Sequence, residues 1–226
     1  DKLGLRENTL VIYTSDNGPW NQPKYYNGGA KNRHPPNSIF WGDAGSFRDG
    51  KASIYEGGSH VPCIMRWPGK IAAGETTNDG LMATIDLLPT FAALTGAKVP
   101  DDRAIDGVNQ LECILGNAKS ARKTYLYNPG SASVQSTILQ GNAIREGDWK
   151  LISPLKVMQF LEDGGTGEWE LYNLKDDIGE TTDLADRYPE KVQRLKRLLE
   201  ANEKVFSRAK PLKRGKRGKR NEPKGK

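Results

Sequence analysis

Two short runs of apolar and β-branched residues near the start of the chain are predicted to be strands. Residues 9–14 read TLVIYT and residues 60–67 read HVPCIMRW. The first run is bounded by polar residues, which is typical of a strand buried on both faces, as in a parallel α/β sheet. Residues 20–47, between the runs, are rich in Gly, Pro, Asn and Tyr and have no sustained period. We therefore expect a long loop there, and long loops inside compact domains usually carry function.

A helix is predicted to open at Asp86. This residue can cap the first turn, and Pro89 lies within that turn, where its missing N–H is no loss. An apolar face is supplied by Leu87, Leu88, Phe91 and Leu94. Gly96 follows this face, and a glycine at such a position is a common helix stop.

After Pro100 the pattern changes to shorter alternating runs. The segments TYLYN, ILQGNAIREG, WKLIS and EWELYNL read as strands of an antiparallel sheet, because turns containing Gly and Asp separate them. A last helix begins near Pro189, and its apolar stripe comprises Val192, Leu195, Leu198, Leu199, Val205 and Phe206. The pattern thus predicts the end of an α/β domain, followed by a small antiparallel sheet with a terminal helix.

The composition is globular and somewhat polar. Of 226 residues, 36% are hydrophobic and 8% aromatic, and no run approaches the roughly 18 consecutive apolar residues of a membrane span. The net charge of +6 belongs to the tail, because residues 208–226 hold ten Lys or Arg and one acid, which leaves about −3 for the rest. This tail is predicted to be disordered. It is either a solvated end or a weak contact for polyanions such as sulfated glycans, nucleic acid or anionic lipid.

The two cysteines, Cys63 and Cys113, have no metal-binding spacing. Cys63 lies in the apolar run of residues 60–67, so we predict a small buried hydrophobe rather than a reactive thiol. Whether the two cysteines form a disulfide stays open at this stage, and so does the redox compartment.

Asp16, Asn17 and Gly18 directly follow the first predicted strand. In open α/β sheets, ligand sites form beyond the carboxyl ends of strands, and Asp and Asn oxygens suit Ca²⁺ or Mg²⁺ rather than Zn²⁺. Gly18 lets the backbone turn away without a steric penalty. The same residues are also ordinary turn chemistry, since Asn-Gly favours hairpins. A Pro-rich loop rather than a paired strand follows, which weakens the hairpin interpretation.

Lys51 is a second candidate. It follows a glycine in a loop that leads back into the second predicted strand. An ammonium group is a compact charge that can hold an anionic oxygen in a dry site. The alternative is a solvated surface lysine without a function.

Taken together, these two segments resemble the sulfatase family of the alkaline phosphatase superfamily, its arylsulfatase-like members in particular. The matching strings are SDNG (residues 15–18) and GKxxxYEGGxxVPxxxRWPGKI (residues 50–71). The resemblance continues through IDLLPTFAALTGA (85–97), IDGVN (105–109), IREGDWKLI (144–152) and ELYNLKDDIGETTDLA (170–185). It covers most of the chain apart from the loop after Gly18 and the basic tail.

The resemblance implies that Asp16 and Asn17 ligate one divalent ion, usually calcium. It also implies that Lys51 contacts the sulfate group of the substrate, in a catalytic and substrate-binding role. A sulfate ester is attacked at sulfur while negative charge grows on the departing oxygen. Calcium and a fixed lysine would stabilise this charge without reorganisation. The Glu56-Gly57-Gly58 turn is expected to be scaffold, with glycines for close backbone approach.

Two histidines complete the candidates. His34, in the variable loop, is either a substrate contact or a solvated side chain, and His60 is expected to be structural.

Part of the family's catalytic machinery is absent from this sequence. The nucleophile of the family is a formylglycine made from a Cys/Ser-x-Pro-x-Arg motif, which the chain lacks. The metal-binding aspartate pair, the arginine and the His and Lys residues that precede the DNG strand in the family are also missing, because fifteen residues precede Asp16. We therefore expect a C-terminal fragment of a longer sulfatase, with the formylglycine upstream. Such a fragment would hold half a calcium site and would not turn over sulfate esters by itself.

The expected fold class is α/β, namely the C-terminal part of an alkaline-phosphatase-like α/β sandwich followed by a small antiparallel sheet with a C-terminal helix. Residues 1–100 would end the catalytic α/β domain, residues 101–207 would form a small α+β subdomain, and residues 208–226 the tail. By family analogy, the protein is expected to be exported to the periplasm, a lysosome or the outside of the cell.

Two other functions stay open. A phosphoesterase of the same superfamily is one, although such enzymes commonly bind two transition metals through extra Asp and His ligands, and this chain has two histidines. A non-catalytic anion or glycan binder that uses the basic tail is the other. Within the sulfatase interpretation, aryl sulfates and sulfated carbohydrates remain equally open as substrates.

Overall fold

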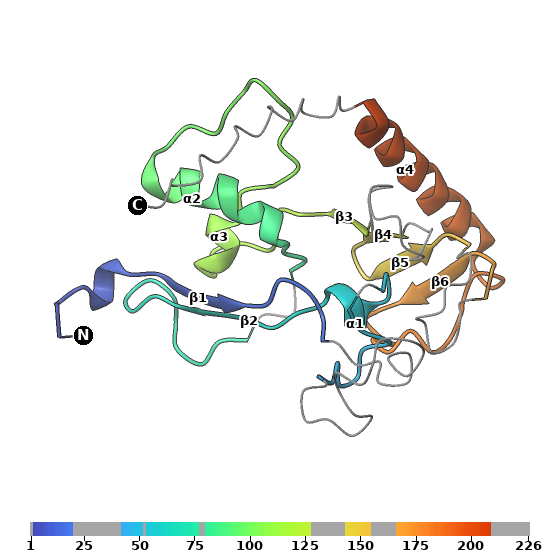
Figure 1. Ribbon diagram of the computed structural model, residues 1–226, viewed down its shortest axis with the longest axis horizontal. Helices are drawn as coiled ribbons and strands as arrows, with labels where there is room; N and C mark the ends of the chain where they lie inside the picture. The colour runs from blue at the N-terminus through green and yellow to red at the C-terminus, as the bar shows by residue number, and fades with distance from the viewer. Residues whose placement is uncertain are drawn as a thin grey trace, which may run out of the picture.

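The computed structural model describes residues 2–19, 42–51, 53–76, 80–127, 143–154 and 166–208. Its elements are, in order, η1 (Arg6–Asn8), β1 (Val11–Thr14), α1 (Glu56–Ser59), β2 (Cys63–Arg66), η3 (Thr84–Asp86), α2 (Leu87–Thr95), α3 (Leu111–Ile114), β3 (Thr124–Tyr127), β4 (Ala143–Glu146), β5 (Trp149–Ile152), β6 (Glu170–Asn173) and α4 (Pro189–Arg208). Figure 1 shows β1, β2, α2 and α3 on one side of the molecule, the sheet β3–β6 with α4 on the other, and α1 between them. The small antiparallel sheet and the C-terminal helix that the sequence predicted are confirmed.

Both N-terminal strands form, but as an exposed antiparallel ribbon. β1 pairs with β2, with Thr14 opposite Cys63. Tyr13 is 65% exposed and Ile64 63% exposed, so the prediction of a strand buried on both faces of a parallel sheet is wrong for the described residues. The physical reason is that β1 and β2 form a sheet of two strands, which leaves their faces without a covering layer among the described elements.

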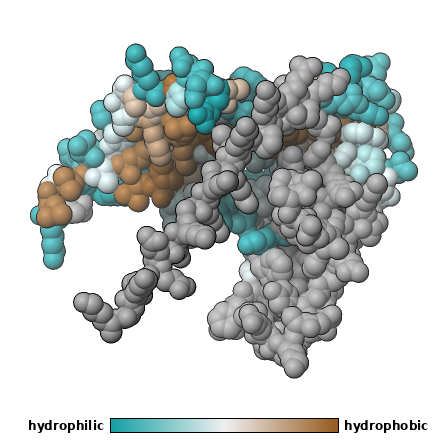
Figure 2. Space-filling view, turned by 45° about the horizontal axis from the view of Figure 1, so that its top comes forward, coloured by the Kyte–Doolittle hydropathy of each residue, from teal (hydrophilic) through white to brown (hydrophobic). Residues whose placement is uncertain are grey.

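Apolar side chains gather on the same side of the molecule. Ile85, Leu88 and Phe91, on η3 and α2, are exposed, as is Val11 of β1. Figure 2 shows the hydrophobic colour concentrated on the left of the view, the side on which Figure 1 places β1, β2 and α2. The apolar face predicted for the helix after Asp86 is therefore partly exposed within the described residues.

The cysteine predictions are settled in part. Cys63 is exposed on β2, so the prediction that it is buried is wrong, for the same reason that β1 is exposed. Cys63 and Cys113 are both free, so they do not form a disulfide in this structure.

The helix predicted after Asp86 forms as α2, and Gly96 ends it in the left-handed conformation with a φ of 73°. The predicted cap does not form, because the carboxylate of Asp86 makes no hydrogen bond to the first turn of α2. It is fully buried instead, and it accepts hydrogen bonds from the N–H of Ala83 at 2.9 Å and of Val108 at 2.8 Å. The guanidinium of Arg122 donates to both carboxylate oxygens. A buried carboxylate needs a charged partner, and the fold supplies one here.

Loss of this pair is expected to make stability less dependent on pH. Burial alone would raise the pKa of Asp86, but hydrogen bonds from Arg122, Val108 and Ala83 outweigh burial and lower this pKa below its ordinary value of 3.8. A carboxyl with a depressed folded-state pKa contributes stability above its unfolded pKa and loses it as the pH falls through the folded value. We expect Asp86→Asn to lower the free energy of unfolding by about 3–5 kcal/mol at neutral pH, since one partner of a buried pair is removed.

Urea unfolding of the wild type and of Asp86→Asn at a series of pH values tests this expectation. The difference between the two proteins should shrink below about pH 4. A difference that stays constant down to acid pH would contradict the assignment of the carboxylate as the charged partner of Arg122.

The four C-terminal strands that were predicted form one antiparallel sheet in the order β3-β4-β5-β6. The last helix begins at Pro189, as predicted, and it packs on one face of this sheet. The core between them comprises Ile144, Leu151, Leu171, Leu195 and Leu199. Among the described residues, no helix is both long enough and apolar enough to cross a membrane.

The opposite face of the sheet packs on the segment that contains α1. This second core comprises Ile54, Tyr55, Tyr127, Ala143, Ile152, Tyr172 and Leu174. Residues on both sides of the predicted domain boundary at residue 100 therefore share one core. The division into residues 1–100 and 101–207 stays a prediction, and residues 209–226 of the predicted tail lie outside the described residues.

Candidate functional site

The structure brings the two candidate segments together through their backbones. The N–H of Gly18 donates to the carbonyl of Gly58 at 3.0 Å, and the N–H of Lys51 donates to the carbonyl of Pro19 at 2.8 Å. Asp16 and Asn17 directly precede the first of these bonds, at the end of β1. The sequence separates the segments by more than thirty residues, yet the fold ties them into one junction.

Three glycines allow the backbones in this junction to approach closely. A Cβ atom on Gly18 would overlap the carbonyl oxygen of Gly57, and a Cβ on Gly57 would overlap the carbonyl oxygens of Arg48 and Asp49. A Cβ on Gly58 would likewise overlap a backbone carbonyl. The prediction that Gly57 and Gly58 serve close approach is confirmed. Gly18 does not have a positive φ, so close approach rather than a turn explains it.

The side chains of the three predicted site residues make no structural contact with the described part of the chain. Asp16 and Lys51 are exposed, and Asn17 is half-buried. Within the described ranges, none of these three side chains forms a hydrogen bond or an ion pair, whereas the backbone N–H of Lys51 and the backbone carbonyl of Asn17 are hydrogen-bonded. Side chains that hold no structural contact on a fixed backbone are suited to bind a ligand. Their roles in binding metal and sulfate stay predictions.

The donor chemistry at the end of β1 fits part of a calcium site. Asp16 offers a carboxylate and Asn17 an amide oxygen, which are the hard ligands that Ca²⁺ prefers. Among the described residues, no group of three or more His, Cys, Asp or Glu side chains is placed to hold a metal ion. Because Ca²⁺ takes six to eight oxygens, Asp16 and Asn17 can supply only some of them.

A buried polar cluster, which was not singled out from the sequence, surrounds the first residue of α1. One carboxylate oxygen of Glu56 accepts from the ammonium of Lys150 at 2.9 Å and from the hydroxyl of Tyr127 at 2.7 Å. The other lies 3.0 Å from Nδ1 of His60 and 3.6 Å from Nη1 of Arg145. Burial alone would raise the pKa of Glu56, but the charge of Lys150 and the hydrogen bonds from His60, Lys150 and Tyr127 hold this pKa well below its usual range.

Lys150 is shared between two buried carboxylates. Its Nζ lies 2.8 Å from Oε1 of Glu180, and the other oxygen of Glu180 accepts the backbone N–H of Glu56 at 2.6 Å. Lys150, Glu56 and Glu180 are each no more than 2% exposed. The sequence does hold a signal for Lys150. On β5 it lies two positions from Ile152, which packs in the core that faces α1, and side chains two apart share a face of a strand.

A second buried group holds the backbone that leads to Lys51. The guanidinium of Arg48 lies 3.8 Å from the centre of the Tyr55 ring, and it donates to the hydroxyl of Tyr172 at 3.0 Å. The hydroxyls of Tyr55 and Tyr172 both donate to one oxygen of Glu170 at 2.8 Å. Arg48 therefore anchors the start of the Lys51 loop to the sheet.

Of the two histidine candidates, the structure describes His60 alone. His60 contacts Glu56 and stacks on the ring of Phe47 with a centroid distance of 4.2 Å, which agrees with the predicted structural role. His34 lies outside the described residues.

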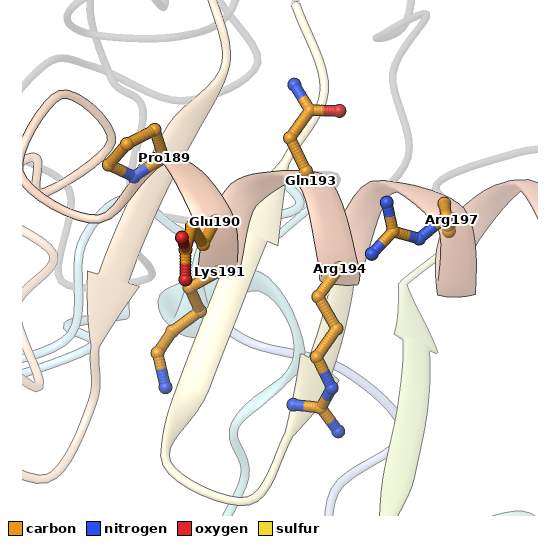
Figure 3. Close-up of a pocket in the computed structure, with 6 residues that line it drawn as sticks. All are labelled: Pro189, Glu190, Lys191, Gln193, Arg194 and Arg197. Carbon is orange, nitrogen blue, oxygen red and sulfur yellow. The ribbon is translucent and has the colours of Figure 1, made fainter.

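A pocket on the surface of α4 is separate from this junction. It is lined by Pro189, Glu190, Lys191, Gln193, Arg194 and Arg197 (Figure 3). Arg194 pairs with Glu146 at 2.6 Å, and the ammonium of Lys191 lies 4.0 Å from the centre of the Trp149 ring. These two charges are already used within the fold, and α4 covers the face of the sheet opposite to α1.

Comparison with solved structures identifies the fold class of the chain. A protein described in work on the metabolism of multiple glycosaminoglycans by Bacteroides thetaiotaomicron matches with a TM-score of 0.66 and 31% identity, over 90% of this chain and 40% of that chain. A second structure, solved in complex with its substrate D-glucosamine-2-N,6-O-disulfate, matches with a TM-score of 0.63 and 27% identity, over 95% of this chain and 38% of that chain. The fold is thus that of the alkaline-phosphatase-like hydrolases to which sulfatases belong.

Sequence comparisons identify the family. The family model named Sulfatase matches residues 1–97. N-acetylgalactosamine-6-O-sulfatase of B. thetaiotaomicron is 33% identical over 89% of this chain, and human arylsulfatase A is 38% identical over 66% of it. The chain belongs to the sulfatase family, as its motifs predicted. It spans 37% of the length of the first relative and 25% of the second.

Proposed function

We propose that the protein containing this chain is a sulfuric ester hydrolase, and that this chain supplies one side of its active site. The observation that carries the proposal is the junction in which Gly18 bonds to Gly58 and Lys51 bonds to Pro19. This junction brings the segment that carries an acid and an amide next to the segment that carries a lysine, in a chain of the sulfatase family. Asp16 and Asn17 would ligate calcium, and Lys51 would bind the sulfate group.

The role of Lys51 follows from its charge and its fixed backbone. Its ammonium donates hydrogen bonds to anionic oxygens, and its backbone is tied to Pro19 before any substrate arrives. Such a preorganised donor stabilises charge that develops in the transition state at no cost of reorganisation. A calcium ion held by Asp16 and Asn17 would supply Lewis-acid polarisation of the sulfate oxygens. The family's formylglycine nucleophile would come from outside this chain.

The proposed substrate class is a sulfated carbohydrate. N-acetylgalactosamine-6-O-sulfatase matches 89% of this chain, and the structure that covers 95% of it was solved with a sulfated glucosamine. Arylsulfatase A, by comparison, matches 66% of the chain. Arylsulfatase G of Rattus norvegicus also matches 82% of the chain, at 29% identity. The proposal of a sugar sulfate therefore rests on the higher identity of the sugar sulfatase over the larger share of the chain, 33% over 89%.

Hydrolysis assays of the whole protein that contains this chain test the proposal. The substrates are N-acetylgalactosamine-6-sulfate, 4-methylumbelliferyl sulfate and 4-methylumbelliferyl phosphate, with release of sulfate or phosphate measured. We expect sulfate release, fastest from the sugar. Cleavage of the phosphate ester without cleavage of either sulfate would favour the phosphoesterase alternative.

Replacing Asp16 by alanine is expected to weaken calcium binding by the whole protein. The variant removes the only charged ligand that this segment offers, so the calcium concentration for half-saturation should rise roughly tenfold or more. Isothermal titration calorimetry measures the affinity. The matched control is Asp101→Ala, which removes an exposed carboxylate that lies on neither candidate segment. Equal calcium affinities of the two variants would contradict the assignment of Asp16.

A further inference from the structure

The cluster around Glu56 forms a closed ring of contacts on the first turn of α1. The ammonium of Lys150 donates a hydrogen bond to the side chain of Glu56 at 2.9 Å and forms an ion pair with Oε1 of Glu180 at 2.8 Å, without the geometry of a hydrogen bond. The other oxygen of Glu180 accepts the backbone N–H of Glu56 at 2.6 Å. Both the side chain and the backbone of Glu56 are therefore fixed by one ring. Lys150 supplies the ammonium of this ring and is 0% exposed, whereas the guanidinium of Arg145 lies farther from Glu56, at 3.6 Å.

The residues that follow Glu56 form the junction of the candidate site. Gly57 donates its N–H to the carbonyl of Arg48 at 2.9 Å, and the carbonyl of Gly58 accepts the N–H of Gly18. The glycines leave no free space between these backbones, because a Cβ on Gly18 or Gly57 would overlap a carbonyl oxygen. A shift of α1 would therefore be transmitted to both site segments.

The geometry points to Lys150 as a positioning residue, which acts through Glu56 to hold α1 against the segments of Asp16, Asn17 and Lys51. This inference rests on the proposed function for what the positioned residues do. Among the described residues, the contacts of Lys150 are with Glu56, Glu180 and the ring of Tyr127, and not with Asp16, Asn17 or Lys51. Residues that orient the ligands of a metal typically change its affinity when they are replaced.

The test compares two cations, Lys150 and Arg122, which each pair with a buried carboxylate but lie next to different parts of the fold. Lys150→Met removes the ammonium and keeps a side chain of similar length. Arg122→Met is the matched control, since Arg122 pairs with buried Asp86 and also bonds to the carbonyls of Asp106 and Thr124, away from α1. Lys150→Met removes the nearest cation of Glu56 and of Glu180, and Arg122→Met removes the cation of Asp86, so both variants should lose thermal stability.

Amide hydrogen exchange of the whole protein reports positioning directly. The N–H groups of Gly18 and Lys51 close the junction, so we expect them to exchange roughly tenfold faster in Lys150→Met and at the wild-type rate in Arg122→Met. Calcium affinity, measured by calorimetry, should fall about 10- to 100-fold in Lys150→Met alone. Unchanged exchange of both amides in Lys150→Met, or equal acceleration in Arg122→Met, would overturn the inference.

A milder variant keeps the test decisive if Lys150→Met does not fold. Tyr127→Phe removes one hydrogen bond to Glu56 and leaves the ring in the core. It should accelerate exchange of the same two amides by a smaller factor, and no acceleration would count against positioning through Glu56. A wild-type protein that neither binds calcium nor cleaves sulfate esters would refute the proposed function, while the exchange comparison would still decide the role of Lys150.

Discussion

Replacing Lys51 by alanine is expected to lower kcat for sulfate ester hydrolysis by about 100- to 1,000-fold, the usual effect of removing one preorganised donor from a developing charge. The reason is that, in the proposed role, the attraction between the Lys51 ammonium and the sulfate oxygens is strongest in the transition state. Its backbone bond to Pro19 does not involve the side chain, so the junction itself should persist. Steady-state kinetics of the whole protein on a sugar sulfate measure the effect.

The matched control is Lys70→Ala. Lys70 also follows a glycine and is also exposed, but it lies in the turn after β2. Its replacement should leave kcat unchanged. Equal losses in the two variants would show that the effect is not specific to Lys51, and no loss in either would identify Lys51 as a solvated surface lysine. Both outcomes would refute the proposed role.

The second large effect is expected from Gly18→Ala. Its Cβ would overlap the carbonyl oxygen of Gly57, and a backbone atom held inside a junction cannot move aside as a flexible side chain can. We expect the free energy of unfolding to fall by about 3 kcal/mol or more, at the upper end of overpacking effects. Chemical denaturation measures this loss.

Gly74→Ala separates the steric effect from the loss of glycine itself. Gly74 has a φ of 77°, but nothing lies within 4 Å of a Cβ placed there. The cost should be about 1–2 kcal/mol, from the left-handed backbone alone. A larger loss for Gly74→Ala than for Gly18→Ala would show that the junction relaxes easily.

Local sequence pattern was sufficient for most of the secondary structure. The alternation around Leu126, Leu151 and Leu171 predicted the strands of the sheet, and the stripe from Val192 predicted α4. The hydrophobic pattern predicted which segments are strands, but it did not predict correctly which strands are buried. The run around Tyr13 has the composition of a buried strand, but its burial depends on neighbours that the run cannot specify.

The candidate site was likewise predicted only in part from the sequence. Asp16, Asn17 and Lys51 were found because short motifs hold them, and the structure then showed that their segments meet. Glu56 and Lys150 were missed as partners, because charged residues in a short turn and in a strand read as ordinary surface positions. Only the fold reveals that these charges are buried together.

The ring on Glu56 has a consequence for the order in which a ribosome makes this protein. Its members are separated by 94 residues between Glu56 and Lys150 and by 124 residues between Glu56 and Glu180. Synthesis runs from the N-terminus, so the segments of Asp16 and Lys51 emerge before the residues that hold them in place. Contacts so distant along the chain also form slowly. The first part of this region to be translated is therefore among the last to acquire its native geometry.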